Sequence, residues 1–219
     1  MITTIIFDMN GVITDDEELH ELATKEVFRD IGVNLSSQNY QEFCLGRTDV
    51  VAFRDLFEKF NLKNQFKDSL IAKKSLKYQE LVKGKLKVYP GVIALIKNLS
   101  KKYTLALTTS STFEEVQLVV DQLGIKNMFK VIVTSNDVIH GKPNPEPYLL
   151  TAKKLNVPYE NCLVIEDSEN GIQSAKQAGM ICIALTNTED RTKLMEADQI
   201  IENYAKISNR FIEQFDTIP

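Results

Sequence analysis

Apolar and polar positions follow two different periods along this chain. Residues 2–7 form a short β-branched and aromatic run that stops at Asp8, which predicts a buried strand followed by a loop. From about residue 15 to about residue 83 the apolar positions instead recur at helical spacing, and no convincing strand interrupts them. We therefore predict a small helical bundle with the apolar positions Leu19, Leu22, Ala23, Val27, Phe53, Leu56, Phe57, Phe60, Ile71, Tyr78 and Val82.

Beyond residue 85 short apolar runs alternate with helical periods. The predicted strands are 103–107, 131–133, 162–165 and 181–185, and the predicted helices are 90–99, 113–123, 145–155 and 171–178. This alternation is typical of βαβ units and a parallel sheet, to which the first strand should also belong. We predict an α/β fold with a Rossmann-like parallel-sheet core (residues 1–14 and 86–219) and an inserted helical cap domain (residues 15–85).

Composition narrows the class of protein. The chain has 219 residues, of which 43% are hydrophobic and 26% charged, as in ordinary globular proteins. Its net charge of -4 argues against nucleic acid or an anionic membrane as a main partner. Cys44, Cys162 and Cys182 are widely spaced and odd in number, which predicts no disulfide framework and favours a reducing compartment. No signal peptide or membrane span is visible, so we expect a cytoplasmic monomer.

Polar side chains lie where four of the predicted strands end. They are Asp8, Thr108, Thr109, Ser110, Glu166 and Asp167 at three strand ends, and Lys142, which follows the third predicted strand after a loop. Ligands bind outside the carboxyl ends of parallel strands, so we expect these side chains to meet. The three carboxylates suit magnesium, whereas the hydroxyls, the backbone N–H of Ser110 and the lysine suit phosphate oxygens. A carboxylate between a cation and a phosphate can act as a nucleophile and form an aspartyl-phosphate.

Four segments resemble the motifs of the haloacid dehalogenase (HAD) superfamily of phosphatases. They are FDMNGVITD (7–15), LTTSS (107–111), GKPNPEPY (141–148) and VIEDSENGIQSAKQAGM (164–180). The order and spacing agree over nearly the whole chain, and the branch it resembles most is the β-phosphoglucomutase-like one, which includes many sugar-phosphate phosphatases. The resemblance implies an HAD-like core with a helical cap and a small phosphorylated metabolite as the substrate.

The resemblance also assigns a role to each motif residue. Asp8 would be the nucleophile, and Mg²⁺ would be held by Asp8, Glu166, Asp167 and the backbone carbonyl of Asn10. Thr109 and Ser110 would bind the transferring phosphoryl group, and Lys142 would neutralise charge between it and Asp8. Gly11 would allow the tight turn that aims backbone donors at the phosphate.

One position departs from the family pattern. The family has an aspartate two residues after the nucleophile as general acid and base, whereas this chain has Asn10. An amide cannot exchange a proton at useful pH, and loss of a general acid typically costs ~10²–10⁴ in rate. We therefore expect reduced activity, either natural or introduced by substitution. Asn10→Asp should raise turnover by about 10²-fold.

The cap contributes further candidates. His20 is either a packing residue of the first cap helix or a residue that contacts the substrate. LGRTD at 45–49 resembles the specificity loop of the family's cap, with Gly46 in its expected place. Phosphomutases of the branch carry basic residues at the positions of Leu45 and Asp49. Arg47 is either an exposed surface residue or the holder of a second anionic group.

The sequence thus predicts a Mg²⁺-dependent phosphohydrolase that acts on a small phosphorylated metabolite, with a sugar phosphate as the expected substrate. Two alternatives stay open. One is a sugar phosphomutase of the β-phosphoglucomutase type. The other is a phospho-ligand binding protein with impaired chemistry, which Asn10 favours.

Overall fold

The computed structural model describes residues 1–63 and 67–217, and its centre is a parallel sheet. Within these residues six strands follow the order β3-β2-β1-β4-β5-β6, and all pair in parallel. Their bounds are β1 (Thr4–Phe7), β2 (Thr104–Thr108), β3 (Val131–Val133), β4 (Cys162–Glu166), β5 (Ile181–Leu185) and β6 (Gln199–Ile201). The predicted α/β class is confirmed.

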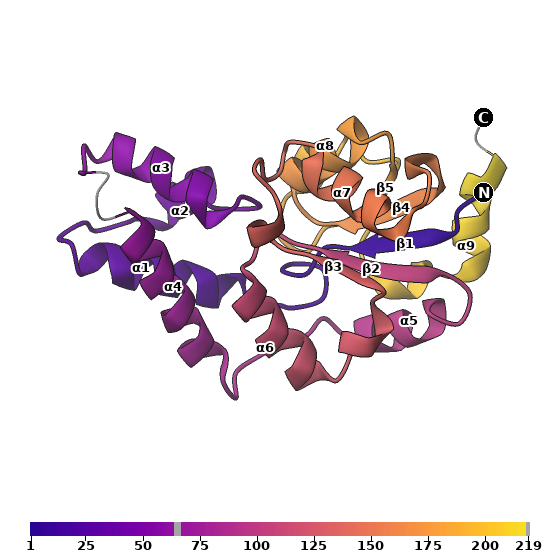
Figure 1. Ribbon diagram of the computed structural model, residues 1–219, viewed down its shortest axis with the longest axis horizontal. Coiled ribbons are helices and arrows are strands. Elements are labelled where there is room, and N and C mark those ends of the chain that lie inside the picture. The colour runs from indigo at the N-terminus through magenta and orange to yellow at the C-terminus, as the bar shows by residue number, and fades with distance from the viewer. Residues whose placement is uncertain (64–66, 218–219) are drawn as a thin grey trace.

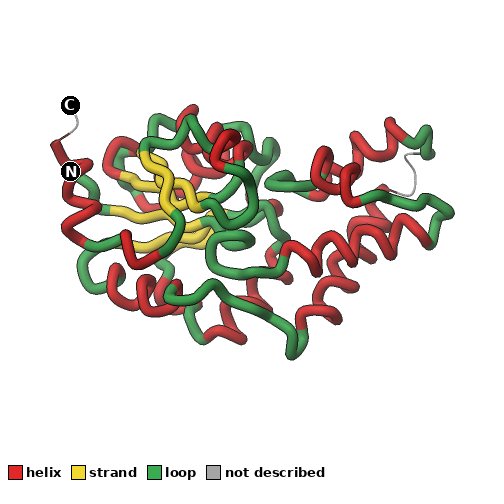
Figure 2. The backbone as a smooth tube through the Cα atoms, turned by 180° about the vertical axis from the view of Figure 1, so that it is seen from behind, coloured by secondary structure: helices red, strands yellow, loops and turns green. Residues whose placement is uncertain are grey.

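Helices cover both faces of the sheet (Figures 1 and 2). One face packs against α5 (Val92–Leu99), α6 (Phe113–Leu123) and α9 (Asn209–Glu213). The other packs against α7 (Glu146–Leu155) and α8 (Glu169–Gln177). Successive β1 residues point to opposite faces, so that Ile5 and Phe7 join the first core and Ile6 joins the second. This explains why each central strand is apolar throughout.

Between β1 and α5 the chain forms a separate layer of helices, which lies beyond one end of the sheet in Figure 1. They are α1 (Glu17–Arg29), α2 (Ser37–Phe43), α3 (Asp49–Lys59) and α4 (Lys67–Val82). Phe28 packs edge-on against Phe53 and Phe57 in the centre of this layer. The two chain segments that join it to the core run side by side, since Thr14 pairs with Val88 and the N–H of Asp15 donates to the carbonyl of Lys87.

The structure also departs from the predicted elements. Leu22 is 42% exposed, because the inward face of α1 is formed instead by residues that include the polar His20 and Thr24. β6 and α9 were not predicted, since each is too short to establish a period of its own. Both depend on tertiary contacts: Ile201 and Ile212 belong to the core that contains Phe7. No helix among the described residues is long and apolar enough to cross a membrane.

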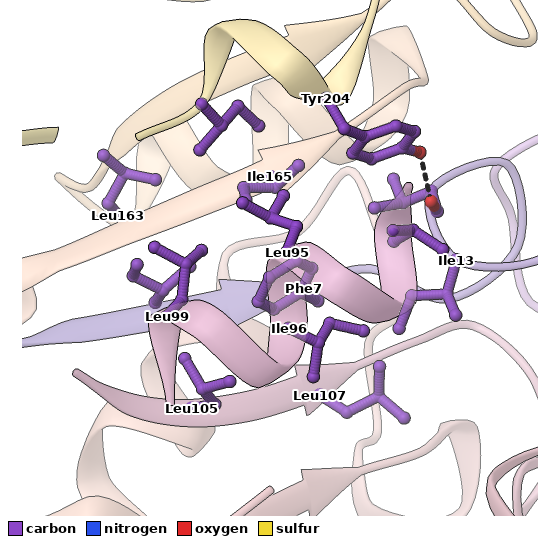
Figure 3. Close-up of a cluster of buried hydrophobic side chains, with 14 of the residues drawn as sticks. Phe7, Ile13, Leu95, Ile96, Leu99, Leu105, Leu107, Leu163, Ile165 and Tyr204 are labelled. Atoms are coloured by element: carbon purple, nitrogen blue, oxygen red, sulfur yellow. Dashed lines mark hydrogen bonds between the residues drawn. The ribbon is translucent and has the colours of Figure 1, made fainter. Parts of the chain in front are cut away.

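Tyr204 joins the C-terminal part of the chain to the loop that follows β1. Its hydroxyl donates to the carbonyl of Val12 (Figure 3) and accepts a hydrogen bond of 3.1 Å from Nδ2 of Asn187. Nδ2 of Asn187 also donates to the carbonyl of Gly11 at 2.7 Å. The same loop carries Asn10 and begins at Asp8, so these contacts hold the loop against the core.

We expect Tyr204→Phe to lower the free energy of unfolding by about 1–2 kcal/mol, because the buried Val12 carbonyl loses its donor. Urea unfolding measures the change. Tyr159→Phe is the matched control, since Tyr159 is 50% exposed, and it should stay within about 0.5 kcal/mol of the parent protein. Equal effects at the two positions would contradict the role assigned to Tyr204.

Candidate active site

The predicted strand-end residues converge on one cleft between the core and the cap helices. Asp8 follows β1, Glu166 is the last residue of β4, and these two strands are neighbours in the sheet. Lys142 comes from the loop between β3 and α7. The cleft is lined from the core by Asp8, Asn10, Thr109, Ser110, Ser111, Lys142, Asp167, Ser168 and Thr188, and from the cap by Glu17, His20, Tyr40, Cys44, Leu45, Gly46, Arg47, Asp49 and Lys74.

Lys142 bridges two of the carboxylates. Its Nζ lies 2.5 Å from Oδ1 of Asp8 and 2.5 Å from Oε1 of Glu166. All three side chains are buried, and Lys142 is only 3% exposed. Burial lowers the pKa of Lys142, but the charges of Asp8 and Glu166 outweigh that effect and hold this pKa above its usual range. Lys142 is therefore charged, and it joins the loop before α7 to β1 and β4.

Glu166 is held by donors on both of its oxygens. Oε1 also accepts from the Tyr148 hydroxyl at 2.6 Å, and Oε2 accepts from the backbone N–H of Asp167 at 3.0 Å and from the Ser168 hydroxyl at 3.2 Å. Burial raises the pKa of Glu166, but Lys142 and these hydrogen bonds together have the larger, opposite effect. The pKa of Glu166 therefore lies below its ordinary value. Glu166 is consequently ionised and anchors Lys142.

Asp8, Glu166 and Asp167 carry more negative charge than Lys142 can balance. Oxygen atoms of the three carboxyl groups lie within 4.8 Å of one another. Burial raises the pKa of Asp8 to about 7, although Lys142 opposes the rise. Burial and the charges of Glu166 and Asp8 raise the pKa of Asp167 well above its ordinary value. A divalent cation would relieve this repulsion, and a set of hard carboxylate oxygens fits one.

Gly11 and Gly46 allow two close approaches in the cleft. A Cβ atom at Gly11, where φ is +78°, would lie 1.8 Å from Oδ2 of Asp167. A Cβ atom at Gly46, where φ is +68°, would lie 2.9 Å from the Ser168 hydroxyl. Asn170 also donates to the carbonyl of Leu45 at 3.3 Å. Glycine therefore lets the turn after Asp8 reach the carboxylates and lets the cap loop rest on the core.

Asn10 lies between the core and the cap. Its Oδ1 accepts from the Ser111 hydroxyl at 2.7 Å and lies 3.4 Å from the Thr109 hydroxyl. Its Nδ2 donates to the carboxylate of Asp16 at 3.1 Å and lies 3.0 Å from Nε2 of His20. The amide is thus held on both sides, beside the predicted phosphate-binding hydroxyl of Thr109.

His20 is buried in the cap and not on its surface. Its ring stacks on Tyr78 with the centroids 3.8 Å apart, and Nδ1 lies 3.0 Å from Nζ of Lys74. Burial, followed by the charge of Lys74, lowers the pKa of His20 well below its ordinary value, so the imidazole is neutral. The ring packs within the cap and also borders the cleft, so a contact between His20 and the substrate stays a prediction.

The cap side of the cleft is itself rich in acids. Lys74 pairs with Asp49 at 2.9 Å, and Glu17 accepts from the Tyr40 hydroxyl at 2.5 Å. Burial raises the pKa of Glu17 to about 7. Arg47 lines the cleft, but its guanidinium donates to Asp55 at 2.5 Å and to the carbonyl of Phe43 at 3.1 Å. The basic side chains of the cleft therefore already contact carboxylates.

Sequence patterns did not reveal several of the polar residues in or beside the cleft. They are Asp16, Glu17, Tyr40, Lys74, Ser111, Tyr148 and Thr188. Lys74 lies among other lysines of α4 and nothing in the sequence sets it apart from them, yet it is only 4% exposed. A signal was available for Ser111 and Tyr148, which belong to the LTTSS and GKPNPEPY segments. The others lie in cap helices, loops or connections, and their partners are distant in sequence.

A Rossmann-like parallel sheet with a helical layer inserted after its first strand defines a capped α/β enzyme. A sequence model described as haloacid dehalogenase-like hydrolase matches residues 5–185, and the chain belongs to this family. It is 32% identical over 202 residues to "Phosphorylated carbohydrates phosphatase" of Thermotoga maritima, covering 90% of this chain and 91% of that protein. It is 27% identical over 218 residues to "Beta-phosphoglucomutase" of Bacillus subtilis, covering 96% and 93%.

Solved structures agree with this assignment. The crystal structure of a mutant of CbbY from Rhodobacter sphaeroides in complex with xylulose-(1,5)bisphosphate superposes with a TM-score of 0.85 at 27% sequence identity. The match covers 95% of this chain and 97% of that one. The predicted HAD-like architecture and the predicted family are therefore both confirmed.

We expect Lys142→Met to lower the free energy of unfolding by about 3–5 kcal/mol, since it leaves Asp8 and Glu166 buried without their cation. A carboxyl group whose pKa is raised in the folded protein lowers the free energy of unfolding as pH increases. The loss begins near pH 4, the pKa of the group in the unfolded chain, and is complete above its pKa in the folded protein. The loss should therefore be larger at pH 8 than at pH 5. Urea unfolding in the presence of a chelator measures it at both pH values.

Lys176→Met is the control for Lys142→Met. Lys176 forms a partly exposed ion pair with Asp198 at 2.6 Å, so its loss should cost under about 1 kcal/mol. If the two lysine variants unfolded alike at pH 8, Lys142 would not be compensating buried carboxylate charge.

Proposed function

We propose that this protein is a Mg²⁺-dependent phosphatase that hydrolyses the monophosphate of a small sugar or related polyol through an aspartyl-phosphate on Asp8. The observation that carries the proposal is the buried set of Asp8, Glu166 and Asp167 around Lys142 at the carboxyl edge of the sheet. The names of related phosphatases of phosphorylated carbohydrates agree with it. We also expect it to act in the cytoplasm as a monomer.

The residues present fit a magnesium ion. Asp8, Asp167 and the backbone carbonyl of Asn10 would hold it, and Glu166 would add its charge beside them while it anchors Lys142. When bound, the ion supplies positive charge next to the phosphate and so stabilises the negative charge that develops during transfer. Without such an ion, burial and then the repulsion within the cluster keep the pKa values of Asp8 and Asp167 raised.

The remaining chemistry follows from the side chains. Lys142 contacts Oδ1 of Asp8, so Oδ2 is the oxygen that attacks phosphorus. The ester P–O bond breaks, and the leaving oxygen takes a proton from water, because Asn10 has none to give. Thr109, Ser110 and Lys142 bind the phosphoryl oxygens. A water molecule then cleaves the aspartyl-phosphate and regenerates Asp8. Both steps are slow in the absence of a carboxyl group at position 10.

The cap side of the cleft favours a substrate with one phosphate. Arg47 is bonded to Asp55, Lys74 is bonded to Asp49, and Glu17 faces the same space, so a second anionic group would meet acids. Hydroxyl groups, in contrast, can bond to Glu17, Tyr40 and Asp49. Cys44 and Leu45 add an apolar wall, and Gly46 leaves room beside it. This arrangement supports hydrolysis of a monophosphate over sugar phosphomutation.

Asn10 also favours a second candidate function. A chain that forms the aspartyl-phosphate slowly, or that binds the substrate without cleaving it, would act as a phospho-ligand binding protein. The two candidates differ in turnover and not in binding. Phosphate release that continues beyond one equivalent per protein molecule decides for the phosphatase.

We expect phosphate release with Mg²⁺ from at least one member of a panel of hexose, pentose and polyol monophosphates. Asp8→Asn should reduce the rate at least 10³-fold, because it removes the attacking carboxylate. Asp15→Asn, which alters an exposed acid near Asp8, should leave the rate within about twofold of the parent. A coupled assay follows conversion of hexose 1-phosphates to 6-phosphates in parallel. Conversion faster than phosphate release would refute the phosphatase assignment in favour of the mutase.

We expect Asp167→Asn to weaken Mg²⁺ binding by at least tenfold, because it removes one charge from the carboxylate cluster. Isothermal titration calorimetry with MgCl₂ measures the dissociation constant without any substrate. Asp198→Asn is the control, since Asp198 pairs with Lys176 at a partly exposed position. This variant should bind Mg²⁺ with the same affinity as the parent protein. Equal affinities in all three proteins would sink the metal assignment.

A further inference from the structure

Asp16 is a buried carboxylate in the segment that joins β1 to α1. It is 1% exposed, and donors from both sides of the cleft surround it. The Thr14 hydroxyl donates to Oδ1 at 2.8 Å, and the Tyr78 hydroxyl of α4 donates to Oδ2 at 2.5 Å. Nδ2 of Asn10 lies 3.1 Å from Oδ1 and 3.2 Å from Oδ2. Asp16 thus connects the loop after Asp8 with the last helix of the cap.

These contacts fix the direction of the Asn10 amide. Its nitrogen faces a carboxyl group whose two oxygens already accept from the Thr14 and Tyr78 hydroxyls, and its oxygen faces the Ser111 hydroxyl at 2.7 Å. If the amide were turned over, Oδ1 would lie against the carboxylate of Asp16, and acceptor would meet acceptor. A carboxylate at position 10 would have the same defect in either orientation. The side chain at position 16 therefore requires a donor at position 10.

The contacts of His20 show that, apart from Asp16, the side chains around position 10 do not require a hydrogen-bond donor there. Nε2 of His20 lies 3.0 Å from Nδ2 of Asn10, and Nδ1 lies 3.0 Å from Nζ of Lys74. A neutral imidazole has a single acceptor nitrogen, so one of these contacts joins two donors. A carboxylate at position 10 would accept from Nε2–H and leave Nδ1 to accept from Lys74. Asp16 is thus the group that opposes a carboxylate at position 10.

We propose that Asp16 is a positioning residue that selects the amide at position 10 and aims its oxygen at Ser111. Asn10 and Asp16 then form a matched donor–acceptor pair. Exchange of the two side chains, Asn10→Asp together with Asp16→Asn, preserves the pair and places a carboxyl group beside Thr109 and His20. The kinetic part of this inference rests on the proposed phosphatase function, whereas its structural part does not.

A double-mutant cycle tests the pair by thermal unfolding at pH 8. Asn10→Asp alone should lower Tm by about 5 °C, since two carboxylates then face each other in a buried position. The variant with both changes should return to within about 2 °C of the parent, so the two effects are not additive. Asn10→Asp combined with Asp15→Asn is the matched control, because it removes the same charge at the exposed neighbouring residue. The Tm of this control should stay as low as that of Asn10→Asp alone.

Phosphate release from one sugar monophosphate gives the second readout. Asn10→Asp alone should gain less than the roughly 10²-fold expected from the sequence for a general acid at this position, because Asp16 opposes the new carboxylate. The exchanged variant should have a kcat about tenfold higher than that of Asn10→Asp alone, with the same KM. The reason is that the new carboxyl group then occupies the position of the Asn10 amide. The Asp15 control should match the single variant in both constants.

The outcomes separate the two proposals. If the exchanged variant and Asn10→Asp have the same Tm and kcat, Asp16 does not position residue 10. If Asn10→Asp is unfolded and the exchange restores folding, the pair is established; an exchanged variant that is itself unfolded overturns it. If no protein in the set releases phosphate while Tm shows the predicted coupling, the pair stands and the proposed phosphatase function fails.

Discussion

The carboxyl edge of the sheet holds three buried carboxyl groups and one buried ammonium group, and most of the cleft can be understood from that imbalance. Lys142 compensates Asp8 and Glu166 directly, at 2.5 Å each, while no described lysine or arginine contacts Asp167. Tyr148, Ser168 and a backbone N–H hold Glu166 in place beside Lys142. The remaining acidity makes the site suitable for a divalent cation and, beside it, a phosphate.

Much of this site could be predicted because parallel strands bring their carboxyl ends together. Asp8, Thr109 and Glu166 each stand where an apolar run stops, so strand boundaries alone placed them at one edge. Helices α6 and α7 could also be predicted, because an amphipathic pattern that continues for about three turns indicates a helix. Lys142 follows a strand less directly, and its placement depended on the GKPNPEPY segment.

The missed features share a different cause. β6 has three residues and gains its strand geometry from pairing with β5, which no local pattern encodes. Lys74 resembles its neighbouring surface lysines, and only its contact with Asp49, 25 positions earlier in the chain, identifies it as buried. Asp16 resembled an ordinary residue at a helix start. Its burial depends on Tyr78, which lies 62 residues away. Long-range partners of single polar residues are what periodicity cannot reveal.

The position of Asn10 links the chemistry of the cleft to the placement of the cap. Its oxygen bonds to Ser111 of the core, and its nitrogen bonds to Asp16, which in turn bonds to Tyr78 of α4. A shift of the cap that moved α4 away from the core would remove the Tyr78 donor from Asp16 and leave it bonded to Thr14 and Asn10. The orientation of residue 10 and the position of the helical layer are therefore coupled through one carboxylate. Gly46 of the cap also rests against Ser168 of the core, and Ser75 of α4 lies 3.3 Å from the Thr112 hydroxyl, so Asp16 is one of several contacts between the two layers. A change of the side chain at position 10 is therefore expected to reach the contact between the core and the cap through Asp16.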